Sequence, residues 1–188
     1  NITLNGQNAT RNWGVLLDAS ATIQSSATVT GGTLAGIIQN AGVLIDIRFT
    51  GEFLSGGTLS GNVKNTNGGT VKNVKLDADT KVDGGKVSGN VEGKKEKPAK
   101  LTNIKVESNT TLSNVILDNT VELPKDKTVT LVNVSFVSVT IVTNIILQGS
   151  VTGDAVKPTV LDEGVEIGDD TAVSNVVITK KVKFTTKI

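Results

Sequence analysis

The 188-residue chain contains no cysteine, methionine, histidine or tyrosine, and only 3% of its residues are aromatic. Without cysteine and histidine, it has no disulfides, no thiolate or imidazole metal ligands and no histidine-based hydrolytic triad. The scarcity of aromatic residues and the net charge of +1 argue against a nucleic-acid partner, which needs stacking platforms or a basic stripe. The chain contains no run of 18 apolar residues, which is the length that a membrane-spanning helix needs. The sequence points to no cofactor and no metal.

The residues that dominate instead are glycine, threonine, valine and asparagine. Valine and threonine favour strands, whereas glycine and asparagine favour turns, and hardly any stretch has a helical pattern. The composition therefore predicts an all-β protein with many corners. Its length fits a single domain spanning residues 1–188.

A short phrase, apolar, polar, Asn or Gly, apolar, polar, apolar, recurs along nearly the whole chain. It occurs at 71–76, 101–106, 112–117, 131–136, 142–147 and 173–178. Glycine adopts the left-handed backbone conformation freely, and asparagine tolerates it better than most other residues. The phrase is therefore typical of a sharp corner between two strands.

These corner residues form two interleaved series. The first series is Gly6, Gly36, Gly61, Gly89, Asn114, Asn144 and Asn175. The second series is Gly14, Asp46, Asn73, Asn103 and Asn133, with a degenerate member near Asp162. Steps of 25 to 31 residues within the first series indicate a solenoid. We predict a single-stranded parallel β-helix of six to seven coils of 25–31 residues, forming a rod roughly 30 Å long.

The stacked asparagine corners resemble the asparagine ladder of parallel β-helix proteins of the pectate-lyase-like superfamily. The resemblance covers nearly the whole chain, but it concerns the fold and the corner, not an activity. Residues 165–173 are also similar to the hexapeptide repeat of left-handed β-helices. Coils of 25–31 residues depart from the 18-residue coil of that fold, so we expect the right-handed form.

Four variable segments, 64–69, 93–99, 124–127 and 152–158, have the composition of turns or loops. Each follows a corner of the first series, which predicts that all four project from one side of the rod. Such a shared side would serve either as a binding surface or simply as a place where insertions are tolerated.

Enzymes that resemble this chain in fold use clustered carboxylates, a calcium site, or an arginine or lysine base on an outer sheet face. Two groups of carboxylates are candidates: Asp77, Asp79 and Asp83, and separately Asp162, Glu163, Glu166, Asp169 and Asp170. The second group lacks the glycine-bounded spacing of a calcium loop. The only arginines are Arg11 and Arg48. We expect both groups to be solvated acidic faces, and the sequence does not indicate an enzyme.

Threonine pairs of the kind that order water on flat solenoids occur at Thr28 and Thr30 and at Thr128 and Thr130. They do not recur from coil to coil, so ice binding is disfavoured.

Glycosylation sequons begin at Asn1, Asn8, Asn109 and Asn133. Asn133 is also a corner residue, where a stacked amide could not carry a glycan. Asn8 and Asn109 are therefore the candidate glycosylation sites.

Both ends of the chain have strand alternation with no helical cap, as residues 1–6 and 176–188 show. Charge is also uneven, with five charged residues in the first 60 and 32 in the remaining 128. The first residue is Asn1, which fits either removal of a signal peptide or excision from a longer protein.

We predict an exported structural β-solenoid that self-assembles through its ends into an extracellular filament or cell-surface layer. The alternative is a carbohydrate-binding or polysaccharide-cleaving β-helix, or a segment of a larger adhesin.

Overall fold

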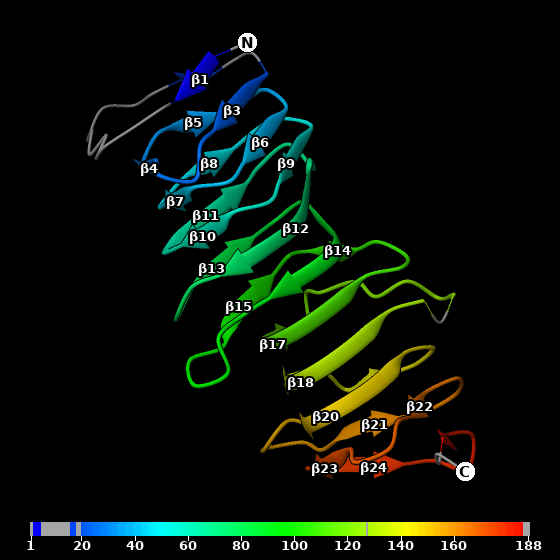
Figure 1. Cartoon of the computed structure of the whole chain (residues 1–188). Coiled ribbons are helices and arrows are strands. Elements are labelled where there is room, and N and C mark those ends of the chain that lie inside the picture. The colour runs from blue at the N-terminus through cyan, green and yellow to red at the C-terminus, as the bar shows by residue number, and fades with distance from the viewer. Residues whose placement is uncertain (1, 5–15, 18–19, 127, 186–188) are drawn as a thin grey trace.

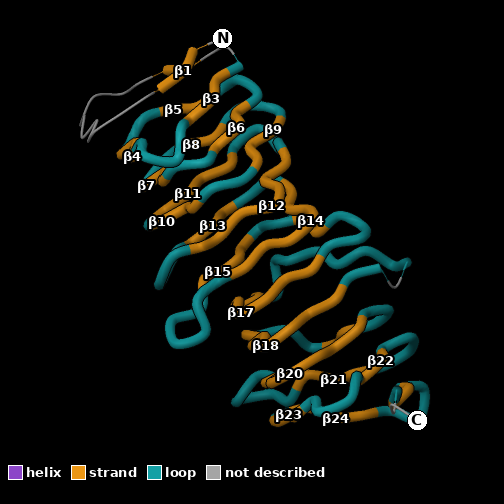
Figure 2. Tube along the Cα trace, in the orientation of Figure 1, coloured by secondary structure: helices purple, strands orange, loops and turns teal. Residues whose placement is uncertain are grey.

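The computed structural model describes residues 2–4, 16–17, 20–126 and 128–185. The chain winds into a rod that runs from the N-terminal strands at one end to the C-terminal strands at the other (Figure 1). The described residues form short strands joined by turns, without any helix (Figure 2). Every strand pairing among them is parallel. The predicted all-β parallel β-helix is therefore confirmed, and its right-handed sense stays a prediction.

Most coils contribute three short strands, which stack on those of neighbouring coils to form three faces. Face 1 contains β1 (Ile2–Leu4), β3 (Ala21–Ile23), β6 (Ile38–Asn40), β9 (Phe53–Ser55), the first halves of β12 (Thr70–Leu76) and β14 (Lys86–Glu92), and β16 (Lys105–Val106). It continues as a separate three-stranded sheet of β19 (Ile141–Val142), β21 (Thr159–Leu161) and β24 (Val176–Ile178).

Face 2 follows face 1 along the chain. It contains β4 (Thr28–Thr30), β7 (Val43–Ile45), β10 (Thr58–Ser60), the second halves of β12 and β14, the first halves of β17 (Thr111–Asp118), β18 (Thr130–Val137) and β20 (Ile146–Thr152), then β22 (Glu166–Ile167) and β25 (Lys183–Phe184).

Face 3 completes the coil. It contains β2 (Leu16–Leu17), β5 (Thr33–Leu34), β8 (Arg48–Phe49), β11 (Asn62–Asn65), β13 (Lys81–Asp83), β15 (Ala99–Thr102), the second halves of β17, β18 and β20, and β23 (Ala172–Ser174).

The coils are shorter and more numerous than predicted. Paired residues in neighbouring coils are 15 positions apart at Thr28 and Val43, and 22 apart at Ser150 and Ala172. The rod accordingly has about ten turns, not six to seven coils of 25–31 residues. With strands about 4.8 Å apart, its length is about 50 Å instead of 30 Å.

The prediction of coil length was wrong because glycine and asparagine corners occur at all three boundaries between faces. In the first series, Gly61 joins faces 2 and 3, Gly89 joins faces 1 and 2, and Asn175 joins faces 3 and 1. Steps within one series therefore do not measure one coil.

The core is a stack of apolar side chains in columns, one column for each inward position. On face 2, for example, Leu112 pairs with Leu131, which pairs with Leu147, and all three are fully buried. Burial of each such leucine contributes about 2 kcal/mol. Most polar residues between the inward positions lie on the outer surface.

The longer connections leave the rod at different corners. Residues 93–98 lie between faces 2 and 3, residues 123–126 and 128–129 lie between faces 1 and 2, and residues 153–158 lie between faces 3 and 1. The prediction of one shared loop side was therefore wrong, for the same reason as the coil length.

Candidate functional site

The predicted corner residues have the left-handed backbone at nearly every described position. Positive φ angles occur at Asp46, Gly61, Asn73, Gly89, Asn103, Asn114, Asn133, Asn144 and Asn175. Gly36 does not have this conformation, and Gly6 and Gly14 lie outside the described residues. The left-handed backbone conformation costs most residues about 1–2 kcal/mol. The recurring phrase therefore places residues that tolerate this conformation where the chain turns.

Some corners also connect one coil to the next through a side chain. The side-chain oxygen of Asn73 accepts a hydrogen bond of 2.9 Å from the backbone N–H of Asn90. Here the single residue Asn73 lies opposite two residues, Gly89 and Asn90, so the strand register shifts by one. The same arrangement pairs Asp46 with Gly61 and Asn62, and Asn133 with Gly149 and Ser150.

The glycine in each of these three corners is required by space as well as by backbone angle. A Cβ atom at Gly61 would overlap the side-chain oxygen of Asp46, and one at Gly89 would overlap that of Asn73. Where single-residue corners stack without a register shift, the amides contact each other instead: Nδ2 of Asn133 donates to Oδ1 of Asn114 over 3.2 Å. These contacts support a folding role for the corner residues.

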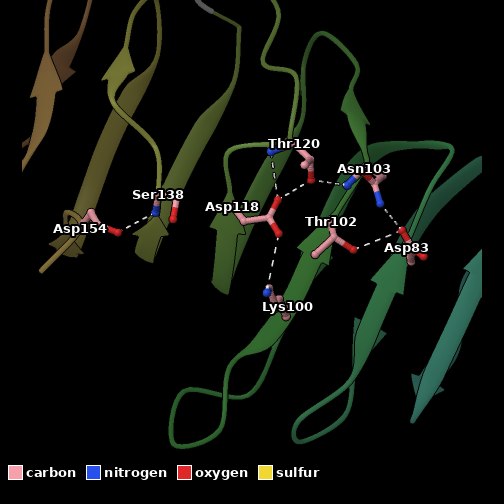
Figure 3. A network of polar contacts seen from close by, with 8 residues as sticks. All are labelled: Asp83, Lys100, Thr102, Asn103, Asp118, Thr120, Ser138 and Asp154. Carbon is pink, nitrogen blue, oxygen red and sulfur yellow. Dashed lines mark hydrogen bonds and ion pairs between the residues drawn. The ribbon is translucent and has the colours of Figure 1, made fainter. Parts of the chain in front are cut away.

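A second polar network follows the corner between faces 3 and 1 (Figure 3). Asp83 accepts hydrogen bonds from Nδ2 of Asn103 at 2.6 Å and from Oγ1 of Thr102 at 3.3 Å. The backbone N–H of Asn103 donates to Oγ1 of Thr120 over 2.7 Å. Asp83 thus binds side chains of the following coil, which gives this candidate carboxylate a structural role.

The network continues through Asp118, which accepts hydrogen bonds from the backbone N–H and hydroxyl of Thr120 and forms an ion pair with Lys100 (Figure 3). One coil further on, the backbone N–H of Ser138 donates to Oδ2 of Asp154 over 2.6 Å. Hydrogen bonds from the backbone N–H groups of Lys157, Ser138 and Val156 lower the pKa of Asp154. This carboxylate therefore stabilises the 153–158 connection in its ionised form.

Asp77 and Asp79 hold another loop in place. Asp77 forms an ion pair with Lys94, and Asp79 forms one of 3.6 Å with Lys97, so both acids bind the 93–98 connection of the next coil. The hydrogen bonds from Lys94 and from the backbone N–H of Ala78 lower the pKa of Asp77. A carboxyl group kept ionised in this way is unsuited to act as a general acid.

The second acidic group is divided between two corners and a strand. Asp162 accepts a 2.7 Å hydrogen bond from Thr179, and Glu163 pairs with Lys181 at 3.5 Å, both between faces 1 and 2. Glu166 lies on β22, and Asp169 and Asp170 follow it at the next corner. Neither acidic group contains three carboxylates close enough together to hold a metal ion, within the ranges that the structure describes.

The sequons and threonine pairs also have defined positions. Asn109 is exposed in the turn between β16 and β17, whereas the amide of Asn133 is occupied by the contact to Asn114. Asn1 and Asn8 lie outside the described residues, so glycosylation at Asn8 and Asn109 stays a prediction.

The partners of Thr28 and Thr30 on the next coil are Val43 and Ile45, so the threonines form no continuous rank there.

A groove of about 430 Å³ lies where faces 3 and 1 meet. Glycines at 51, 68 and 69 leave its floor without side chains, and the exposed ring of Phe53 lies at its rim. Its charged lining residues are Glu52, Lys86 and Glu107. We call this feature the glycine groove; it combines an aromatic ring with carboxylates from different coils.

A second groove, of about 470 Å³, lies on face 3. Its lining includes Thr33, Asp46, Arg48, Asn62 and Lys64. Arg48 and Lys64 are paired residues of adjacent coils and are both exposed. We call this feature the cationic groove.

Neither groove was found from the sequence, because the predicted coil length did not place these residues side by side. The 16-residue spacing of Arg48 and Lys64 is the signal that could have found the second one.

The last described coil leaves core positions open. Phe184 pairs with the buried Ile167 and so occupies an inward position, yet it is 63% exposed. Ile178 pairs with Leu161, which is fully buried, but is itself 39% exposed. An apolar surface therefore lies at this end of the described rod.

No helix in the described ranges is long and apolar enough to cross a membrane. Comparisons of the chain with protein-family models, with curated proteins and with solved structures found no match. The chain is therefore a parallel β-solenoid by its structure, and the resemblance to pectate-lyase-like β-helices stays a prediction.

Proposed function

We propose that this chain is an exported structural β-solenoid whose copies stack coil on coil into an extracellular filament or surface layer. The observation that carries the proposal is the open core of the last described coil. Phe184 and Ile178 occupy positions that are buried in the preceding coil. Exposed apolar side chains at inward positions favour a covering layer that continues the column.

The strand edges at this end support the same proposal. Among the described strands, β23, β24 and β25 pair only with β20, β21 and β22, each on one side. Among the described residues, their other edges have no strand partner, so their backbone N–H and C=O groups are a template for a further parallel strand. A second copy stacked on this end would satisfy both the backbone groups and the apolar side chains. Contacts of this head-to-tail kind do not close and so produce a filament.

Light scattering of the purified chain during size-exclusion chromatography tests the proposal. We expect assemblies whose mass grows with protein concentration, and Phe184→Lys should abolish them by placing a charge in the contact. The matched control is Val156→Lys, since Val156 is 94% exposed in the 153–158 connection, away from the open core. Circular dichroism checks that both variants keep the β-solenoid.

A wild-type chain that stays monomeric at all concentrations contradicts the proposal. Assembly that survives Phe184→Lys shows that the contact does not use this end, which also overturns it.

The glycine groove favours a second candidate function, binding of an oligosaccharide. Aromatic rings and carboxylates are the groups that commonly contact sugars, through stacking on the ring and hydrogen bonds to hydroxyl groups. Phe53 is 40% exposed, and Glu52, Lys86 and Glu107 supply acceptors and a donor around it. Asp77 and Asp79 are less suited to this role, because each is paired with a lysine.

Calorimetric titration with a panel of neutral oligosaccharides tests the second candidate. We expect saturable binding that Phe53→Ala and Glu107→Gln each weaken at least about tenfold. Ile37→Ala is the matched control, because Ile37 is 44% exposed and lies one coil before Phe53 but outside the groove. No binding across the panel, or equal loss in the control, contradicts this function.

A further inference from the structure

Face 3 carries three cationic side chains that form no ion pair within the described residues: Arg48, Lys64 and Lys81. Arg48 and Lys64 are direct partners on adjacent coils, and Lys81 pairs with Asn62, two residues before Lys64. All three side chains are exposed. Like charges placed directly opposite each other on a sheet are destabilising, so this arrangement lowers the stability of the rod.

The two carboxylates nearest these cations, Asp46 in the groove and Asp83 opposite Lys64, form no ion pair with them in the described structure. Oδ1 of Asp46 accepts a 2.7 Å hydrogen bond from the backbone N–H of Asn62. Oδ1 of Asp83, beside Lys64 in the register, accepts from Asn103 in the following coil, over 2.6 Å. Asp46 keeps its negative charge within the groove, but Arg48 and Lys64 are exposed and have no carboxylate in an ion pair, so their charges face the solvent.

Besides the two cations and Asp46, the groove is lined by Gly32, Ile47, Thr33 and Asn62. Thr33 precedes Arg48 in the same outward column and offers a hydroxyl group, and Asn62 offers a side-chain amide. A guanidinium fork and an ammonium group on neighbouring strands, about 4.8 Å apart at the backbone, can contact different oxygens of one small anion. A phosphate monoester carries nearly two negative charges at neutral pH and has several oxygens, so it can contact both cations at once.

We propose that Arg48 and Lys64, with Thr33 and Asn62, bind a doubly charged tetrahedral oxyanion, either a phosphate monoester or a sulfate. Lys81 adds positive potential at the side of the groove. This site lies on face 3 in the N-terminal half of the rod, outside the last described coil, so it is distinct from the contact proposed there.

Titration with inorganic phosphate and inorganic sulfate, followed by amide NMR shifts of the ¹⁵N-labelled chain, tests the site. We expect saturable shifts confined to residues around 33, 48, 62 and 64, and at least about tenfold weaker binding in Arg48→Met and in Lys64→Met. The matched control is Lys157→Met, which removes an exposed lysine from the 153–158 connection. Acetate, with a single charge, should bind more weakly than either oxyanion.

The proposal is overturned if no saturable shift occurs near these residues. Equal weakening by Lys157→Met also overturns it, because binding would then depend only on total charge, and so does acetate binding as tight as that of phosphate. A sulfated polysaccharide and a phosphorylated sugar, titrated in parallel, identify the source of the anion. Tighter binding of one of these than of the inorganic ion assigns the site to that carrier, and equal or weaker binding of both assigns it to the free ion.

Discussion

The side-chain oxygen of Asn73 accepts the backbone N–H of Asn90 over 2.9 Å, across the boundary between two coils. The contact lies where the second coil has one residue more than the first, and so where the regular ladder of backbone hydrogen bonds is interrupted. Asp46 and Asn133 make the equivalent contacts at two other corners. In each case an asparagine or aspartate at the corner of one coil lies opposite a glycine of the next coil. Its side-chain oxygen accepts the backbone N–H of the residue after that glycine, so the next coil can contain one more residue without leaving this donor unpaired.

Substitutions of Asn73 test this relationship. We expect Asn73→Ala to lower the free energy of unfolding by about 2 kcal/mol, since it loses one hydrogen bond and places alanine in the left-handed region. Asn73→Gly should lose only about 1 kcal/mol, because glycine tolerates the backbone angle. Asn73→Asp keeps the acceptor and should change stability least. Urea unfolding measures all three, and equal losses in all of them would contradict the role of the side-chain oxygen.

Two glycines that lie two coils apart, with the coil of Asp46 between them, distinguish backbone strain from steric overlap. Gly31 and Gly61 have φ angles of 69° and 66°, but a Cβ would meet nothing within 4 Å at Gly31 and would overlap Asp46 at Gly61. We expect Gly31→Ala to cost about 1 kcal/mol, and Gly61→Ala about 2 kcal/mol because it also displaces the hydrogen bond of Asp46. In an Asp46→Gly background the two costs should become equal. Thermal unfolding of the four variants decides this, and a persistent difference in that background would refute the steric explanation.

Acid should release the 153–158 connection. The folded pKa of Asp154 lies below its ordinary value of 3.8 because three backbone N–H groups bind the carboxylate. The folded state therefore binds fewer protons than the unfolded state, so this stabilisation is complete above the ordinary pKa and is lost as pH falls through the lowered one. The difference in Tm between the wild type and Asp154→Ala should be largest near neutral pH and should shrink as the pH falls below the ordinary value of 3.8. A difference that stays constant with pH would contradict this role.

The cost of truncating an inward side chain should depend on its place along the rod. Leu131 is fully buried in the middle, and Leu131→Ala should lower stability by about 3 kcal/mol. Ile178 is 39% exposed in the last described coil, and in dilute solution Ile178→Ala should cost less than about 1 kcal/mol. Denaturant unfolding compares the two variants. Equal costs in dilute protein would show that the last coil is covered within a single chain.

Much of the fold followed from the recurring phrase, but the length of the coil did not. Alternating apolar residues around a left-handed residue indicate a corner between strands, and Asn114 and Asn133 do lie at such corners. A three-sided coil needs a corner at every change of face, and the same chemistry serves each of them. The 15-residue spacing of Asp46 and Gly61 reports a true coil, but it is visible only when the two series are merged.

The candidate sites were harder to predict, since they depend on which residues of different coils become neighbours. Asp77 and Asp79 had the composition of an active site, but the lysines that pair with them lie in a loop one coil further on. The glycine groove arises because residues at positions 51 and 69 pack backbone against backbone and leave no side chain on the floor. Such proximity follows from strand register, which the sequence pattern left undetermined.

Electron microscopy of the purified chain over a wide range of concentrations tests the proposed assembly most directly. A single rod of about ten turns is about 50 Å long. Stacking through the open coil predicts unbranched rods of unchanged width whose length increases with concentration, and Phe184→Lys should return them to the single-rod length. Single rods of about 50 Å at every concentration would contradict the account.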